Sequence, residues 1–186
     1  INDKRYPGAT YGINTDVLVP GTSIFSTYPT YTNIPYRTLS GSSMAAPLVA
    51  GVAGLVASKF PSYSALQIGE QVRVTSDDIY SNGVNPDSIK YLAGKGRANA
   101  YRAVTETNAV SVRATDIKFA ETTGSNYNGL FETGESVSVT VALTNYLSQA
   151  LNVNITNECI DPAILLLQKS SNISSMQTMQ TVDSAF

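Results

Sequence analysis

The chain has 186 residues, 42% of them hydrophobic and 14% charged, and a formal net charge of −2. This length and balance indicate a globular protein with one large domain or parts of two, and they exclude an intrinsically disordered chain. The small acidic net charge, without any run of lysine or arginine, excludes a nucleic-acid partner. The single cysteine, Cys159, excludes an intrachain disulfide and a cysteine-ligated metal site.

The start of the sequence and its apolar stretches bear on processing and membrane insertion. No window reaches the roughly 18 consecutive apolar residues of a transmembrane helix, so we expect no membrane span in this segment. The first ten residues, INDKRYPGAT, lack the apolar core of a signal peptide and an initiating methionine. We therefore interpret the sequence as an internal piece of a longer chain.

Residues 1–108 have a mixed α/β pattern. Residues 15–21, TDVLVPG, predict a short apolar strand that ends at a Pro-Gly turn, and residues 22–29 predict a second strand. Residues 30–39 predict a polar, tyrosine-rich loop or edge segment, because Pro35 cannot donate a hydrogen bond within a central strand.

Three helices are expected next along the chain. Residues 42–58 predict a helix with hydroxyl caps at its start and apolar residues on nearly every face, which is typical of a buried helix in the middle of a domain. Residues 61–76 and 94–107 predict two further helices. Gly51 and Gly54 each cost the first helix about 1 kcal/mol relative to alanine, so we expect a close neighbour there.

From about residue 110 the apolar period changes to two. Residues 136–144 alternate strictly between an apolar and a polar face, which predicts a half-buried strand of an antiparallel sheet. Residues 150–158 repeat the alternation, and residues 110–120 and 163–169 predict two more strands. Four short strands with polar turns predict the start of a β-sandwich.

Two serines, Ser42 and Ser43, directly precede the apolar helix. A serine hydroxyl becomes an effective nucleophile only when a positioned base removes its proton. The free N–H groups and the positive dipole end at a helix start can stabilise an oxyanion on the attacked carbonyl. Gly41 lets the chain turn sharply and leaves room for a substrate. The alternative is that the hydroxyls only cap the helix, which is the commoner role of serine at this position.

The chain contains no histidine, which separates two classes of serine hydrolase. In α/β-hydrolases the histidine follows the nucleophile, so that class is excluded. In subtilisin-like proteases the order is Asp, His, Ser, and the base precedes the nucleophile. A chain that begins within such a domain keeps its serine and lacks the histidine.

Residues 40–56, SGSSMAAPLVAGVAGLV, resemble the serine motif of the subtilisin-like serine proteases, G-T-S-M-A-[AS]-P-H-V-A-G. Ser42 replaces the usual threonine, and Leu48 replaces a histidine that is not the catalytic base. Residues 11–27 resemble the family's strand and turn ahead of the motif, and residues 94–104 resemble the helix that closes its catalytic domain.

This resemblance implies the C-terminal part of a subtilisin-like three-layer α/β domain with a parallel sheet over residues 1–108. A partial antiparallel β-sandwich accessory domain follows over residues 109–186. By the resemblance, Ser43 is the nucleophile and its backbone N–H forms half of the oxyanion hole. The catalytic aspartate, the histidine and the oxyanion asparagine belong to motifs before residue 1, so the fragment alone is expected to be inactive.

The same resemblance implies polypeptide substrates, no cofactor for catalysis and a secreted or cell-surface location. Residues 125–146 also resemble the opening of β-sandwich domains that follow bacterial secreted proteases. Asn126, Asn128, Glu132 and Glu135 could gather oxygen ligands for a structural calcium ion. The alternative, an Asx-rich turn leading into a strand, is the favoured interpretation.

The leading hypothesis is a serine endopeptidase that forms an acyl-enzyme on Ser43. Two alternatives stay open. The first is a catalytically dead subtilisin-like binding or structural module. The second is a stand-alone adhesion or interaction domain in which Ser43 is only a helix cap.

Overall fold

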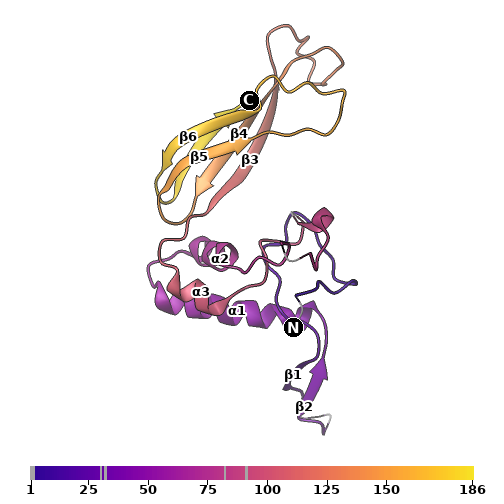
Figure 1. Ribbon diagram of the computed structural model, residues 1–186, viewed down its shortest axis with the longest axis vertical. Coiled ribbons are helices and arrows are strands. Elements are labelled where there is room, and N and C mark those ends of the chain that lie inside the picture. The colour runs from indigo at the N-terminus through magenta and orange to yellow at the C-terminus, as the bar shows by residue number, and fades with distance from the viewer. Residues whose placement is uncertain (1–2, 30, 32, 82, 91) are drawn as a thin grey trace. The chain divides into compact units, whose positions relative to one another are not determined.

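The computed structural model describes residues 3–29, 31, 33–81, 83–90 and 92–186 (Figure 1). The chain divides into two compact units, residues 1–109 and residues 110–186, and each is considered by itself. The described helices lie in the first unit, and the second unit is built from strands.

A hairpin precedes the longest helix of the first unit. Strands β1 (Ile24–Thr27) and β2 (Tyr36–Leu39) pair antiparallel, as the sequence predicts for a strand followed by an edge segment. The strand expected over residues 15–21 is not formed. That segment makes a single parallel bridge, Leu18 to Arg97, because no described segment continues a ladder beside it.

Three helices pack around one apolar cluster in the first unit. Helix α1 (Ser42–Lys59), helix α2 (Ala65–Val74) and helix α3 (Ala100–Thr105) contribute the buried side chains Val56, Val72 and Ala103. Helices α2 and α3 lie on one side of α1 (Figure 1). The cluster therefore covers one face of α1.

The opposite face of α1 lies open. Leu48 and Leu55 are 42% and 54% exposed, and a Cβ atom added at Gly51 or Gly54 would have no described atom within 4 Å. We call these four residues the open face of α1. The expectation of a helix buried on all sides is therefore wrong for this chain, since Val56 is the one buried residue of α1. By length and composition alone, α1 also meets the requirements of a membrane-crossing helix.

Helix α2 differs from α1 because polar side chains are among its buried residues. Its N-terminus carries a capping box, in which the Ser64 side chain accepts from the Gln67 N–H and the Gln67 side chain accepts from the Ser64 N–H. Gln71 is fully buried, and its amide Nε2 donates to the backbone carbonyls of Ala103 and Glu106 at 3.1 and 2.7 Å. These two bonds join α2 to α3.

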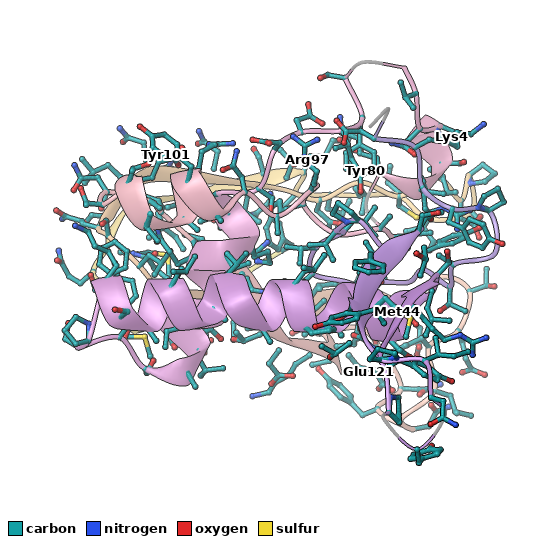
Figure 2. The ribbon with its side chains drawn as sticks, turned by 90° about the horizontal axis from the view of Figure 1, so that it is seen from below. Lys4, Met44, Tyr80, Arg97, Tyr101 and Glu121 are labelled. Carbon is teal, nitrogen blue, oxygen red and sulfur yellow. The ribbon has the colours of Figure 1, made fainter. Side chains whose placement is uncertain are left out.

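A charged network joins the end of α2 to the start of α3. The Asp77 carboxylate accepts hydrogen bonds from Arg97 at 2.7 Å, from Asn99 at 2.9 Å and from Arg102 at 3.4 Å. Arg97, labelled in Figure 2, also donates to Asp3 at 2.6 Å. The Arg97 guanidinium, followed by the Asn99 amide, lowers the pKa of Asp77 below its ordinary value of 3.8.

The backbones of residues 77 and 97 also pair directly, and Gly96 makes this approach possible. Gly96 has φ of 144°, and a Cβ atom added there would lie 2.0 Å from the Asp77 carbonyl oxygen. Asp77 N–H donates to the Arg97 carbonyl at 2.8 Å, and Arg97 N–H donates back at 3.0 Å. A side chain at position 96 would force these two segments apart.

The second unit contains two antiparallel sheets that share one apolar core. Strands β3 (Val112–Glu121), β4 (Val137–Asn145) and β7 (Gln180–Ala185) form one sheet in the order β3-β4-β7. Strands β5 (Ala150–Thr156) and β6 (Ser170–Met176) form the other. The buried centre consists of Leu143, Ala150 and Met176.

The expected strand over residues 163–169 is wrong. Asp161 begins a turn there, since its carbonyl accepts from the Ile164 N–H and its carboxylate accepts from the Ala163 N–H. The apolar side chains that follow are exposed rather than packed. The strand forms later in the chain, at β6. Its sequence is rich in serine and contains only two apolar residues, Ile173 and Met176, so it shows no apolar alternation.

Candidate active site

Helix α1 begins without a side-chain cap. Its N-cap residue is Gly41, with φ of 149° and ψ of 169°, and no side-chain hydrogen bond caps this end among the described residues. The expectation of hydroxyl caps is therefore wrong, because Ser42 and Ser43 are already the first two helical residues. The Gly41 backbone lies in a region that other residues enter only with strain, so this turn requires glycine.

The positive end of the α1 dipole lies at the first turn, where the Gly41 N–H already donates to the Gly21 carbonyl and the Met44 N–H donates to the Gly41 carbonyl. Helix N-termini leave four N–H groups without intrahelical partners, and α1 has no acidic residue in its first turn. Ser43 is exposed in this turn. Pro47 lacks the N–H that would bond to the Ser43 carbonyl. This arrangement suits the stabilisation of an anion beside the Ser43 hydroxyl.

The turn before α1 is held against the start of the hairpin. The Gly41 N–H donates to the Gly21 carbonyl at 2.7 Å, and the Ser23 N–H donates to the Ser40 hydroxyl oxygen at 2.9 Å. A Cβ atom at Gly21 would lie 3.0 Å from the Gly41 carbonyl oxygen. Met44 lies at this hairpin end of α1 (Figure 2). The hairpin and the first turn of α1 are thus fixed to each other.

The chain offers Ser43 no histidine to act as its base, since the sequence contains none. The described residues also hold no group of three or more His, Cys, Asp or Glu side chains that could bind a metal ion. Within these residues, the site places an exposed serine hydroxyl at the positive end of a helix dipole. It does not supply the group that removes the serine proton.

The four residues considered for calcium do come together in the loop between β3 and β4. Asn126 and Asn128 donate through Nδ2 to Glu132 Oε2 at 2.7 and 3.3 Å, and Glu135 accepts from the backbone N–H groups of Asn126 and Glu132. Glu121, which sequence reasoning missed, accepts from the Gly129 N–H at 2.8 Å. The Asn126 and Asn128 side-chain oxygens accept from backbone N–H groups within the loop, as in a hydrogen-bonded turn, whereas Glu121 Oε2 is buried without a hydrogen-bond partner among the described residues. The described residues include no group of acidic side chains placed to bind a metal ion here.

Comparison with known proteins identifies the family of the part of the chain that contains this helix start. Residues 1–102 match the model of the subtilase family. The matched region includes the hairpin, the whole of α1 and the Asp77 network. The chain belongs to the subtilase family, whose members named below are subtilisin-like serine proteases.

Three curated relatives show the extent of the similarity. Thermitase from Thermoactinomyces vulgaris is 48% identical over 103 residues, which cover 55% of this chain and 33% of thermitase. Subtilisin DY from Bacillus licheniformis and subtilisin Savinase from Lederbergia lenta are each 38% identical over 102 residues, 55% of this chain. The aligned part covers 33% of subtilisin DY and 34% of Savinase. The chain thus spans about a third of the length of these relatives.

The family match supports an α/β class for residues 1–102, and the first unit contains both helices and a hairpin. The described strands of this chain form no multi-stranded parallel sheet. The helix α1 lies within the matched region, so we treat it as a helix of the subtilase domain.

Proposed function

We propose that Ser43 is the nucleophile of a secreted or cell-surface serine endopeptidase. The observation that carries this proposal is the position of Ser43 in the uncapped first turn of α1, within a sequence motif that resembles that of its relatives. A serine whose role was to cap the helix would lie one residue before the helix and accept from its first N–H groups. Ser43 lies inside the helix instead.

The proposed reaction is acyl transfer from a peptide carbonyl to the Ser43 hydroxyl oxygen, followed by hydrolysis of the acyl-enzyme. As the hydroxyl attacks, negative charge develops on the carbonyl oxygen. The Ser43 backbone N–H and the positive end of α1 stabilise that charge. The base, its aspartate and the second oxyanion donor come from residues that precede residue 1 in the full-length protein.

The second unit is proposed to be a partial β-sandwich accessory domain, beginning near residue 109. Its two sheets share the core around Leu143, Ala150 and Met176, which supports this assignment. Catalysis requires no cofactor under this proposal, and the substrates are polypeptides. A catalytically dead subtilisin-like module remains the second candidate, because the sequence contains no histidine.

The decisive experiment compares Ser43→Ala with Ser42→Ala in the full-length protein, including the residues before residue 1. We expect Ser43→Ala to lower kcat by several orders of magnitude, to the level left by the oxyanion hole and binding. Ser42→Ala should cost only on the order of 1 kcal/mol in transition-state stabilisation. The rates are measured with a fluorogenic peptide and a peptide ester.

A fluorophosphonate probe with peptide mapping provides the second readout. Label on Ser43 is expected in the full-length protein, and residues 1–186 alone should show neither label nor turnover, since they contain no base for the serine. Label on Ser42, or activity that survives Ser43→Ala, would contradict the proposal. Full-length protein that folds and turns over neither substrate would favour the catalytically dead module.

A further inference from the structure

The charge distribution around the proposed nucleophile is unusual. Between residues 17 and 58 the sequence contains one charged side chain, Arg37, and no aspartate or glutamate. Two other arginines have carboxylate partners, since Arg73 pairs with Glu70 and Arg97 pairs with Asp77, whereas Arg5 lies over the Tyr11 ring. Arg37 therefore lies in a region that offers it no carboxylate from nearby in the sequence.

The Arg37 side chain is nevertheless held in place. Its guanidinium carbon lies 4.9 Å from the centre of the Tyr28 ring, a distance typical of a cation–π contact. Arg37 lies opposite Ser26 in the β1–β2 register, and the Tyr28 N–H donates to the Pro35 carbonyl at 2.8 Å beyond it. A ring contact orients the guanidinium and leaves its positive charge and its N–H donors available to a ligand.

The position of Arg37 ties this charge to the active site. Arg37 lies on β2, six residues before Ser43, so their Cα atoms are separated by no more than about 22 Å. The Gly41–Gly21 and Ser23–Ser40 hydrogen bonds fix the hairpin to the first turn of α1. An extended polypeptide that reacts at Ser43 spans the same distance with about six residues.

We infer that Arg37 is a specificity-determining residue that favours polypeptide substrates with an aspartate or glutamate within about six residues of the scissile bond. This inference rests on the proposed function of Ser43. The exposed Arg37 guanidinium attracts the substrate carboxylate by charge complementarity. Because the pair forms in an exposed region, its effect is modest and sensitive to salt.

The test uses the full-length enzyme and pairs of fluorogenic peptides that differ only by aspartate against asparagine. The pair is moved through the six positions on each side of the scissile bond. At low ionic strength we expect kcat/KM to favour aspartate by about two- to fivefold at one or two adjacent positions. The ratio should fall toward one in 1 M salt, where screening acts within about 3 Å.

Charge variants assign that preference to the residue. Arg37→Gln should bring the ratio to one, and Arg37→Glu should invert it, with the larger change in kcat/KM on the aspartate peptides. Lys59→Gln is the matched control, because Lys59 is exposed at the other end of α1, about 24 Å along the helix from Ser43. This variant should keep the ratio of the unmodified enzyme.

Three results would overturn the inference. These are a ratio of one at every position in the unmodified enzyme, an unchanged ratio in Arg37→Gln, and an equal loss on both members of each pair. If the asparagine peptides are still hydrolysed in a Ser43-dependent manner, the proposed function stands while this inference fails. If no peptide is hydrolysed through Ser43, both fail.

Discussion

Helices α1 and α2 have opposite relations between composition and burial. Helix α1 is built almost entirely from apolar and small residues, yet Val56 is its one buried residue. Four of the ten residues of helix α2 are polar, yet Glu70, Gln71, Val72 and Arg73 are all buried in it. The apolar composition of a helix therefore shows which surface is favourable to bury. The neighbouring segments decide which surface is in fact buried.

The comparison also separates two kinds of stability. The Gln71 amide nitrogen of α2 is buried with partners inside the first unit, since it donates to two carbonyls near α3, whereas Gln71 Oε1 is buried without a hydrogen-bond partner among the described residues. The open face of α1 has no packing neighbour at Gly51 or Gly54, since a Cβ atom added at either glycine would have no neighbouring atom of the described residues within 4 Å. Helix α2 thus has its packing within this chain, whereas the open face of α1 is suited to a neighbour supplied from elsewhere.

The largest expected effect comes from removing the buried carboxylate of α2. The Glu70 and Arg73 side chains are 7% and 11% exposed, and their charged atoms lie 2.6 Å apart. Glu70→Ala deprives a buried guanidinium of this carboxylate, so we expect a loss of about 3 kcal/mol in the free energy of unfolding. The loss is measured by hydrogen exchange of the α2 amides.

The matched control for this pair is Glu106→Ala. Glu106 also pairs with an arginine, Arg102, but their side chains are 40% and 37% exposed. Removing an exposed carboxylate should cost less than about 1 kcal/mol. Equal losses for the two variants would show that burial does not make removal of the Glu70 carboxylate more costly than removal of an exposed one.

Two adjacent residues of α1 test the difference between its faces. In residues 1–186, Val56→Ala leaves a cavity among three helices and should lower the free energy of unfolding by about 2 kcal/mol. Leu55→Ala removes a half-exposed side chain of the open face and should cost less than about 0.5 kcal/mol. Denaturant unfolding followed by circular dichroism measures both values.

The same pair in the full-length protein sharpens the comparison. If residues before residue 1 cover the open face, Leu55→Ala should there cost as much as Val56→Ala. A small cost in both proteins would show that the open face stays in water and that our expectation of a neighbour for α1 is wrong.

The smallest effect concerns acid stability at the junction of α2 and α3. The pKa of Asp77 is lowered in the folded protein by the hydrogen bond from Arg97, then by that from Asn99. A lowered folded-state pKa gives a stabilisation that is present above the ordinary value of 3.8 and is lost as the pH falls through the folded-state value. Asp77→Asn should therefore cost about 1–2 kcal/mol at pH 7 and less below pH 3.

Unfolding curves at several pH values measure this difference. The unmodified chain should lose stability more steeply than Asp77→Asn between about pH 5 and pH 2. Parallel pH profiles for the two proteins would show that the Asp77 carboxylate has no part in acid unfolding.

Helix positions were predictable where local chemistry decides them. The sequence predicts a helix over residues 42–58, and α1 spans Ser42–Lys59. The second helix was expected over residues 61–76, and α2 spans Ala65–Val74 behind the N-cap Ser64, so its existence was predictable and its start was not. The cap of α1 was not predictable, because hydroxyl side chains are the usual caps and only the observed φ and ψ of Gly41 show that it takes that place.

The errors lie where distant segments decide the outcome. Residues 163–169 have the apolar composition of a strand, yet strand β6 forms from a serine-rich segment, because pairing with β5 rather than propensity selects it. The exposure of α1 could not be predicted either, because the apolar pattern of a helix does not show which segments pack against it. For the candidate site, the motif predicts Ser43, and the structure shows this serine exposed in the first turn of α1, while its role stays a prediction. Glu121, at the end of β3, carried no sequence signal.

The close approach at Gly96 has a consequence for mutational scanning. A library that scores peptidase activity would mark position 96 as intolerant to every side chain, alongside Ser43, although glycine contributes no reacting group. The two positions would differ in protein abundance, because a Cβ atom at residue 96 meets the Asp77 carbonyl at 2.0 Å whereas Ser43 is exposed. Scoring abundance with activity would therefore separate the residue that builds the junction of α2 and α3 from the residue proposed to carry the chemistry.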